Sequence, residues 1–279
     1  MAEKVVAIVQ FPGMNCEMET RRALNQVGLD AEIFRWNRQA DELSSFDAFV
    51  LPGGFSYEDR VRAGVVAAKE ALFDVLSQEA ERGKPVLGIC NGAQILLESG
   101  LLPGIHPGQV EMALAHNYIT YNHHVVRRGH HCGWVNLRTE VDADRSPFTG
   151  KLQSNECFPI TVSHGEGRFT CSDPELVRLL HERNQILWRY CDDQGEIREG
   201  LPVNPNGSME NIAGICNPAG NVAALMPHPE RAFYLRQVPS AWKGVWGEKR
   251  RAACGNPEQW NAPGPGYAIF ESLADALKN

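Results

Sequence analysis

A cysteine stands where a short apolar run meets a helix-like run, in the stretch KPVLGICNGAQILLESG of residues 84–100. Glycines on both sides of Cys90, each two residues away, allow the strained backbone that exposes a nucleophile at a strand-to-helix turn. Such a turn lies at a helix N-terminus, where the dipole favours a thiolate over a thiol. The backbone N–H of Asn91 is then placed to bind an oxyanion. The spacing predicts a nucleophilic Cys90, although it also arises by chance around a buried structural cysteine.

A second group of reactive side chains comes late in the chain, where the run ALMPHPERA contains His228, Pro229 and Glu230. In an extended backbone, residues two apart face the same side, so Glu230 can hold the imidazole ring of His228 while Pro229 stiffens the pair. A base oriented by a carboxylate is what a cysteine nucleophile needs. Alone, the pair also fits an ordinary histidine at a strand end. Together with Cys90, it predicts a Cys-His-Glu triad.

Strand-like and helix-like runs alternate through the first hundred or so residues and indicate how these groups are positioned. The runs KVVAIVQ, AEIFRW, DAFVLPGG and KPVLGIC read as strands, and residues 16–28 and 61–83 read as helices. Asn15 is the expected N-cap of the first helix and Gly28 its end, which makes Cys16 a helix-start residue rather than a catalyst. Repeated β–α alternation predicts a mostly parallel, doubly wound α/β sheet with helices on both faces.

Beyond Pro103 the alternation weakens, and the pattern predicts additions to the same sheet rather than a second domain. Strand-like runs recur at CGWVNLR, FPITVSHG, ILWRYC, IAGICN and NVAALMPHP, so we expect antiparallel additions or an extended sheet edge. The Pro/Gly-rich stretch NAPGPGY precedes a final helix, AIFESLADALK. We expect residues 1–279 to form a single domain.

Composition and charge exclude several classes of function. The 279 residues carry a net charge of −7 and lack an extended basic face, which predicts no nucleic-acid partner. No signal-peptide pattern and no apolar run of about 18 residues is present, so we expect a cytoplasmic protein without a membrane partner. The eight cysteines include no C-x-x-C pair, which favours free thiols over disulfides in a chain of this size.

The order of the motifs resembles one family. G-x-C-x-G-x-Q at residues 88–94, LPGG at 51–54 and the late His-Pro-Glu are similar to the class I glutamine amidotransferases, which use a Cys-His-Glu triad. Within that family, FPGMNCE, LPGGFSYEDRVRAG, SHGEG and NPNGSMENIAGICNPAGNVAALMPHPER resemble the glutaminase subunits of phosphoribosylformylglycinamidine synthases. The likeness runs from about residue 5 to residue 231 and resumes at AIFESL.

The resemblance implies a flavodoxin-like glutaminase domain in which Cys90 attacks the carboxamide of L-glutamine. His228, oriented by Glu230, would protonate the leaving ammonia and then activate water. The ammonia would pass to a large synthetase subunit, with a small bridging subunit in the same complex, for ATP-dependent conversion of formylglycinamide ribonucleotide in purine biosynthesis. ATP and Mg²⁺ are expected on that synthetase and no cofactor or metal on this chain, because no motif here resembles a phosphate-binding loop.

The same resemblance assigns roles around the triad. It implies that the backbone of Gly53, Gly54 and Asn91 forms an oxyanion hole and that Gln94 helps to hold glutamine. His164 and Glu166, in the run SHGEG, are candidate residues of the interface with the synthetase.

The chain departs from the family pattern in three places. Ala93 stands where the family has an aromatic residue, and Gly133 where it has a basic one, which puts the local partner or substrate contacts in doubt. Residues 233–262 are an insertion relative to short family members. Its tryptophans at 242, 246 and 260 fit either core packing or an interface.

Other functions were weighed against these motifs. His123, His124, His130, His131 and Cys132 invite a zinc site, but their spacing matches no common structural site, so no metal is predicted. The same glutaminase could serve another ammonia acceptor, or the chain could be an idle binding module. A PfpI-like protein also carries a cysteine elbow on a similar sheet and acts as a redox sensor or hydrolase. Gln94 and the His-Pro-Glu run favour the glutaminase over that alternative.

Overall fold

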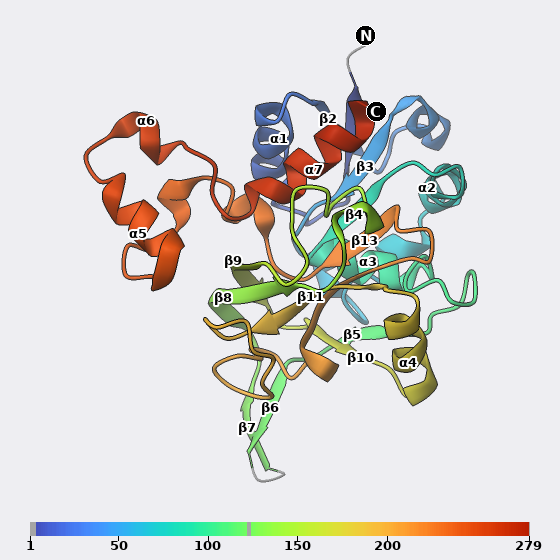
Figure 1. Cartoon of the computed structure of the whole chain (residues 1–279). Coiled ribbons are helices and arrows are strands. Elements are labelled where there is room, and N and C mark those ends of the chain that lie inside the picture. The colour runs from blue at the N-terminus through green and yellow to red at the C-terminus, as the bar shows by residue number, and fades with distance from the viewer. Residues whose placement is uncertain (1–3, 122–123, 279) are drawn as a thin grey trace.

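A nine-stranded sheet forms the centre of the computed structural model, which describes residues 4–121 and 124–278. In spatial order the strands are β2 (Asp30–Arg35), β1 (Val5–Gln10), β3 (Ala48–Leu51), β4 (Val86–Ile89), β13 (Val222–Leu225), β12 (Ile212–Cys216), β11 (Ile186–Cys191), β8 (His131–Thr139) and β9 (Cys157–His164). Helices cover both faces of this sheet, as Figure 1 shows. The doubly wound α/β architecture expected from the sequence is confirmed.

The sheet has a parallel half and an antiparallel half. Strands β2, β1, β3, β4 and β13 pair in parallel, in the strand order of a flavodoxin-like sheet. Strands β12, β11, β8 and β9 continue it with antiparallel pairings. Every residue of β3 and β4 is buried, which explains their continuous apolar runs. The antiparallel additions are therefore as extensive as the parallel part.

The helices and smaller strands complete the fold. The α-helices are α1 (Glu17–Gln26), α2 (Leu72–Glu81), α3 (Asn91–Glu98), α4 (Pro174–Glu182), α5 (Gly244–Ala252), α6 (Pro257–Trp260) and α7 (Tyr267–Lys278). Short 3₁₀ helices are η1 (Ala40–Ser45), η2 (Ser56–Asp59), η3 (Ala67–Lys69), η4 (Ala143–Arg145), η5 (Met209–Asn211), η6 (Pro229–Arg231) and η7 (Leu235–Gln237). Two small sheets pair β5 (Ala113–Ala115) with β10 (Arg168–Thr170) and β6 (Tyr118–Tyr121) with β7 (His124–Arg128). The β6–β7 hairpin extends away from the body in Figure 1.

The prediction of one long helix over residues 61–83 is wrong. Only η3 and α2 form there, separated by Glu70 in an extended conformation. Gly64 has φ +81°, and a Cβ on it would lie 2.7 Å from the backbone nitrogen of Ile95. The chain therefore crosses closely over α3 instead of continuing as a helix, because only glycine accepts this conformation at this distance.

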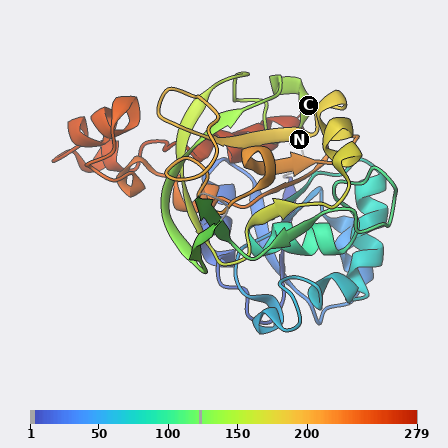
Figure 2. The same cartoon turned by 90° about the horizontal axis from the view of Figure 1, so that it is seen from below.

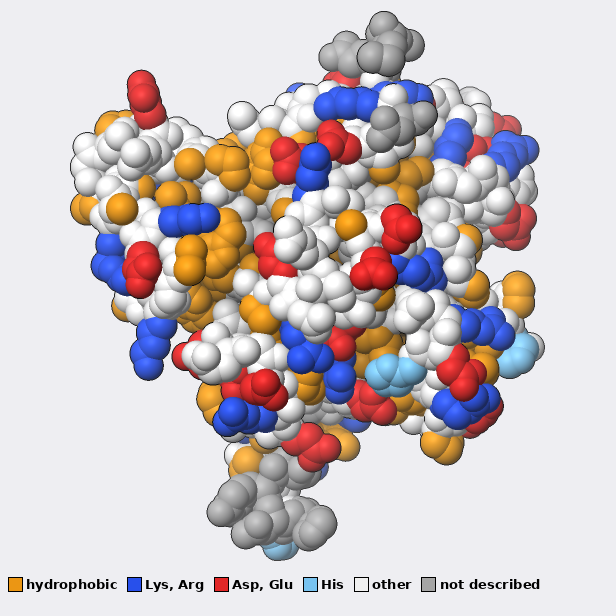
Figure 3. Space-filling model, viewed as in Figure 1, with side chains coloured by type: hydrophobic (Ala, Val, Ile, Leu, Met, Phe, Trp, Pro, Cys, Tyr) orange, Lys and Arg blue, Asp and Glu red, His pale blue; other side chains and the backbone are white. Residues whose placement is uncertain are grey.

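Residues 239–262 form a lobe, carrying α5 and α6, that projects from the body of the protein (Figures 1 and 2). Its small hydrophobic cluster is separate from the main core and includes Leu235, Val238, Trp242, Trp246, Ala253, Ala262 and, from the body, Trp134. Trp260 is 39% exposed. Figure 3 shows hydrophobic side chains where the lobe meets the body. Two of the three lobe tryptophans thus serve local packing, and the assignment of 233–262 as an insertion stays a prediction.

Two further expectations concern the chain as a whole. Among residues 4–121 and 124–278, no helix is both long and apolar enough to cross a membrane. All eight cysteines lie in these ranges and all are free thiols, as the sequence predicts.

Candidate active site

Cys90 lies on a strained turn between β4 and α3. Its backbone has φ 52° and ψ −104°, a conformation that residues with a side chain rarely adopt. A Cβ on Gly88 would lie 2.6 Å from the carbonyl oxygen of Gly92, and a Cβ on Gly92 would lie 2.0 Å from that of Leu51. The two glycines are therefore needed for the turn, and the elbow predicted from their spacing is confirmed as a backbone feature.

His228 and Glu230 meet directly after β13. The Nδ1 atom of His228 lies 2.6 Å from Oε1 of Glu230, and the two residues are 1% and 2% exposed. The contact is made through η6 rather than through the extended backbone that the sequence suggested. The backbone N–H of His228 also donates to the carbonyl of Thr161 in β9, at 2.8 Å. The base is thus fixed from two sides.

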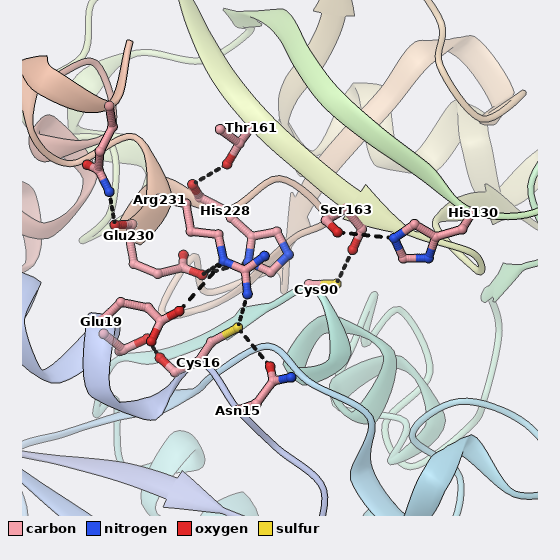
Figure 4. A network of polar contacts seen from close by, with 12 residues as sticks. Asn15, Cys16, Glu19, Cys90, His130, Thr161, Ser163, His228, Glu230 and Arg231 are labelled. Carbon is pink, nitrogen blue, oxygen red and sulfur yellow. Dashed lines mark hydrogen bonds and ion pairs between the residues drawn. The ribbon is translucent and has the colours of Figure 1, made fainter. Parts of the chain in front are cut away.

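The electrostatic environment of His228 favours the imidazolium. Burial by itself lowers the pKa of His228, but the charges of Glu230 and Cys90 outweigh burial and hold this pKa well above its ordinary value. The Nε2 atom of His228 is buried and has no hydrogen-bond partner among the described residues. This nitrogen remains available to exchange a proton. Figure 4 shows Cys90, His228 and Glu230 gathered in one place.

The sulfur of Cys90 contacts β9. Its S–H donates to the carbonyl of Ser163 at 3.7 Å, and the Oγ atom of Ser163 lies 3.1 Å from Nε2 of His130. Cys90 is 6% exposed. The end of β9, together with His130 just before β8, therefore lies next to the thiol.

The loop after β3 packs against both sides of this site. A Cβ on Gly53 would lie 2.7 Å from Cε1 of His228 and 3.1 Å from Sγ of Cys16. Gly54 has φ +148° and approaches Met14 closely. The side chain of Asn91, the first residue of α3, accepts a hydrogen bond from the backbone N–H of Ser56 at 2.9 Å. The structure thus places Gly53 against the histidine and Asn91 next to the elbow, whereas Gly54 approaches Met14 and Asn15.

Comparison with known proteins identifies the family. Residues 3–275 match the CobB/CobQ-like glutamine amidotransferase domain. The chain is 47% identical over 268 residues to phosphoribosylformylglycinamidine synthase subunit PurQ of Methanothrix thermoacetophila, covering 96% of each chain. It is 43% identical over 227 residues to the PurQ subunit of Aquifex aeolicus, covering 81% of this chain and 90% of the relative. The chain belongs to the PurQ family of glutamine amidotransferases.

A solved structure supports the same assignment. The fold is similar to a chain in the PurLQS structure from Thermotoga maritima, with a TM-score of 0.71, 30% identity and 99% of both chains covered. The resemblance inferred from the motifs is therefore confirmed. Membership of the PurQ family argues against a PfpI-like redox protein, which was the alternative from another class.

Gln94 is held by the chain itself in this PurQ-family structure. Its Nε2 donates to the carbonyl of Glu166 at 2.6 Å, and its Oε1 accepts from Nδ2 of Asn91 at 2.8 Å. The same Asn91 nitrogen also donates to Asp59 at 3.2 Å. Burial, together with the nearby charge of Glu166, raises the pKa of Asp59 to about 6. A role for Gln94 in holding glutamine stays a prediction, and its visible role is to tie α3 to the turn after β9.

His164, a candidate interface residue, is buried in this chain. It is 3% exposed, and Nδ2 of Asn117 donates to its carbonyl at 2.7 Å. Burial, assisted by the charge of His228, lowers the pKa of His164 to about 3. This burial argues against a contact with a partner subunit, but the assignment of His164 to the interface stays a prediction. Glu166 has a side chain that is 20% exposed, and its assignment to the interface stays a prediction.

Three residues of the histidine-rich segment lie in strands. His124 lies in β7, His131 and Cys132 lie in β8, and His130 contacts Ser163. His123 lies outside the described residues. The segment is therefore not the loop that its sequence suggested.

Two site residues of this PurQ-family chain were missed or misassigned by sequence reasoning. Cys16, rather than Asn15, is the N-cap of α1. Its Sγ and donor atoms of His228 and Glu230 all lie within 4.8 Å of one another. Arg231, which follows the His-Pro-Glu run, donates to the same sulfur at 2.9 Å. The adjacency of Arg231 to Glu230 was the one local signal available, whereas only the fold brings in Cys16.

Proposed function

We propose that this chain releases ammonia from L-glutamine with Cys90 as the nucleophile, His228 as the acid and base, and Glu230 as the orienting carboxylate. As a PurQ-family protein it is the glutaminase subunit of phosphoribosylformylglycinamidine synthase, an enzyme of purine biosynthesis. The observation that best supports these roles is the 2.6 Å contact between His228 and Glu230, made beside a cysteine on a strained elbow.

In the first half of the reaction, His228 accepts the proton of the Cys90 thiol and the sulfur attacks the carboxamide carbon of glutamine. The carbonyl oxygen becomes an oxyanion. The C–N bond then breaks as His228 returns a proton to the nitrogen, which leaves as ammonia. The product on the protein is a glutamyl thioester on Cys90.

In the second half, His228 removes a proton from water, and the resulting hydroxide attacks the thioester carbon. The C–S bond breaks, glutamate leaves, and the proton returns to the sulfur of Cys90. The negative charge of Glu230 stabilises the imidazolium that forms in both halves, because the pair is buried away from solvent.

We assign the stabilisation of the oxyanion to backbone N–H groups of Gly53, Gly54 and Asn91. Gly53 lies against His228, and Asn91 begins the helix that Cys90 caps, so the positive end of α3 favours the developing charge. Loss of one such donor costs roughly 100- to 1000-fold in turnover.

We propose that the ammonia passes to a large synthetase subunit that binds ATP and Mg²⁺ and converts formylglycinamide ribonucleotide to formylglycinamidine ribonucleotide. A small bridging subunit completes the complex, as the name PurLQS of the similar Thermotoga maritima structure suggests. This chain would bind no cofactor, because its sequence contains no motif that would cradle a nucleotide phosphate.

The test uses Cys90→Ala in the reconstituted complex. Glutamine-dependent synthesis should be abolished, while ammonium salts still support product formation, because the thiol acts on glutamine alone. His228→Ala should behave in the same way. Undiminished glutamine-dependent synthesis by a folded Cys90→Ala complex would overturn the assignment of the nucleophile. Loss of ammonia-dependent synthesis would overturn the proposed division of labour.

A further inference from the structure

Cys16 is a second buried thiol at the site, and its sulfur makes polar contacts on two sides. The guanidinium of Arg231 donates to its Sγ at 2.9 Å, and Sγ lies 3.3 Å from the carboxamide oxygen of Asn15. Cys16 is 1% exposed. Figure 4 shows the sulfur between these two groups.

The contacts of Sγ are those of a neutral thiol. A thiol donates one hydrogen bond and accepts another, so Cys16 can donate to Asn15 while it accepts from Arg231. A thiolate could only accept. Burial raises the pKa of Cys16, although His228 and Arg231 act in the opposite direction. Cys16 is therefore a neutral thiol fixed by its hydrogen bonds, and it does not compete with Cys90 as a nucleophile.

The turn that carries Cys16 also holds the loop of the expected oxyanion hole. The backbone N–H groups of Asn15 and Cys16 both donate to the carbonyl of Gly53, at 3.3 and 3.2 Å. A Cβ on Gly53 would collide with Cε1 of His228 at 2.7 Å and would lie 3.1 Å from Sγ of Cys16. Cys16, Gly53 and His228 are thus mutually packed, and a shift of one displaces the others.

Arg231 connects this cluster to the carboxylate and to α1. Its Nε atom lies 4.0 Å from Oε1 of Glu230 and 3.7 Å from a carboxylate oxygen of Glu19. Arg231 directly follows Glu230 in η6, and its guanidinium thus lies beside the carboxylate that orients His228. The side chain of Arg231 is 36% exposed, so it can be changed with less risk to the core than Cys16.

We propose that Cys16 and Arg231 form a positioning pair for glutamine hydrolysis, an inference that rests on the proposed function of His228. The thiol fixes the imidazole of His228 and the backbone of Gly53 relative to each other, and Arg231 holds the thiol. Neither residue touches the reacting atoms. The pair acts on the rate of the chemical steps rather than on the binding of glutamine.

The decisive comparison is between Cys16→Ala and Cys16→Ser in the chain assembled with its synthetase partners. Cys16→Ala should lower kcat for glutamine about 10- to 100-fold with little change in KM, since misplacement of about 1 Å costs this much. Cys16→Ser should recover most of the lost rate, because a hydroxyl can donate to Asn15 and accept from Arg231. Ammonia-dependent synthesis should be unchanged in both variants.

Two further pairs of variants separate positioning from simple packing. Cys216, which is fully buried in β12, offers the matched pair Cys216→Ala and Cys216→Ser; there serine should do no better than alanine, and kcat should hold in both. Arg231→Gln should lower kcat as Cys16→Ala does, whereas Arg231→Lys should be milder. Arg231→Gln also provides the measurement if Cys16→Ala fails to fold.

Three results would overturn the proposal: an unchanged kcat in folded Cys16→Ala or in Arg231→Gln, no recovery in Cys16→Ser, or an equal loss of ammonia-dependent synthesis. Failure of the proposed function would look different. In that case Cys90→Ala would retain glutamine-dependent synthesis, whatever the Cys16 variants do.

Discussion

The ends of the parallel strands and the C-terminal lobe are built in opposite ways. Cys90, His228 and Glu230 are 6%, 1% and 2% exposed. In the lobe, Val245 and Trp260 are 63% and 39% exposed, and the local cluster is separate from the main core. The site is held in place by the central sheet, whereas the lobe is held largely by its own local cluster.

This difference follows from what each region must do. A nucleophile and a base must keep a fixed separation, so they sit on rigid elements whose neighbours leave no freedom. The lobe meets the body across a groove of about 800 Å³, lined by Asn136 and Pro159 on one side and by Trp242 and Trp246 on the other. None of Cys90, His228 and Glu230 lines that groove. We therefore expect activity and lobe to be separable.

The largest effect is expected for Cys90→Gly. Glutamine-dependent synthesis should disappear with the thiol. The free energy of unfolding should be about 1 kcal/mol higher than that of Cys90→Ala, because glycine adopts φ 52° without strain. Chemical denaturation of Cys90→Gly and of Cys90→Ala measures this difference. Both variants lack the thiol, so the difference in unfolding free energy reports the strain of the backbone. If Cys90→Gly were less stable than Cys90→Ala, the elbow would store no strain.

The next effect is expected for Glu230→Gln. Turnover of glutamine should fall about 10²- to 10⁴-fold, because an amide can hold the imidazole in the wrong tautomer and cannot stabilise its charge. The negative charge of Glu230 helps to hold the pKa of His228 above its ordinary value, so the His228 limb of the pH–rate profile should move to lower pH. An unmoved limb would show that Glu230 does not control the base.

Much of the first region could be predicted because its determinants are local. The glycines around Cys90 fix the elbow, and the His-Pro-Glu run brings base and carboxylate together within one turn. The parallel strands read as continuous apolar runs because both faces of the sheet are covered. Helix α4 also had local signals that were overlooked: Asp173 caps it by accepting from Glu175 at 2.9 Å, and Pro174 begins it.

What could not be predicted depends on contacts between distant segments. Cys16 and Arg231 are 215 positions apart and meet only because β1 and β13 lie in one sheet. The burial of His164 depends on Asn117 and on a turn that no periodicity reveals. Residues 61–83 have the pattern of a helix, but the close approach of Gly64 to α3 overrides it. In each case tertiary packing outweighs a valid local preference.

A smaller effect is expected on the pH dependence of the unfolding free energy, through the buried His164. The folded-state pKa of His164, about 3, lies below its unfolded value of 6.5, so the unfolded chain binds more protons between these values. The stability that His164 contributes is complete above pH 6.5 and is lost as the pH falls toward 3. Between about pH 7 and pH 5, His164→Gln should therefore lose about 2 kcal/mol less unfolding free energy than the parent chain. Equal losses in urea denaturation would contradict this burial argument.

The smallest effect is expected for Trp260→Ala in the lobe. The ring of Trp260 is partly exposed, and its defined contact is the Arg250 guanidinium, 4.9 Å from the ring centroid. Removing it should change the unfolding free energy by at most about 0.5 kcal/mol, as for other exposed positions. Trp242→Ala, which opens the local cluster against Trp134, should cost about 2 kcal/mol and serves as the matched control. Glutamine-dependent synthesis should stay at the parent rate in Trp260→Ala, because the defined contact of this ring is with Arg250 and not with a residue of the triad. A lowered rate in a stable Trp260→Ala complex would mean that the lobe contacts a partner or influences the site, and the separation of the two regions would then be wrong.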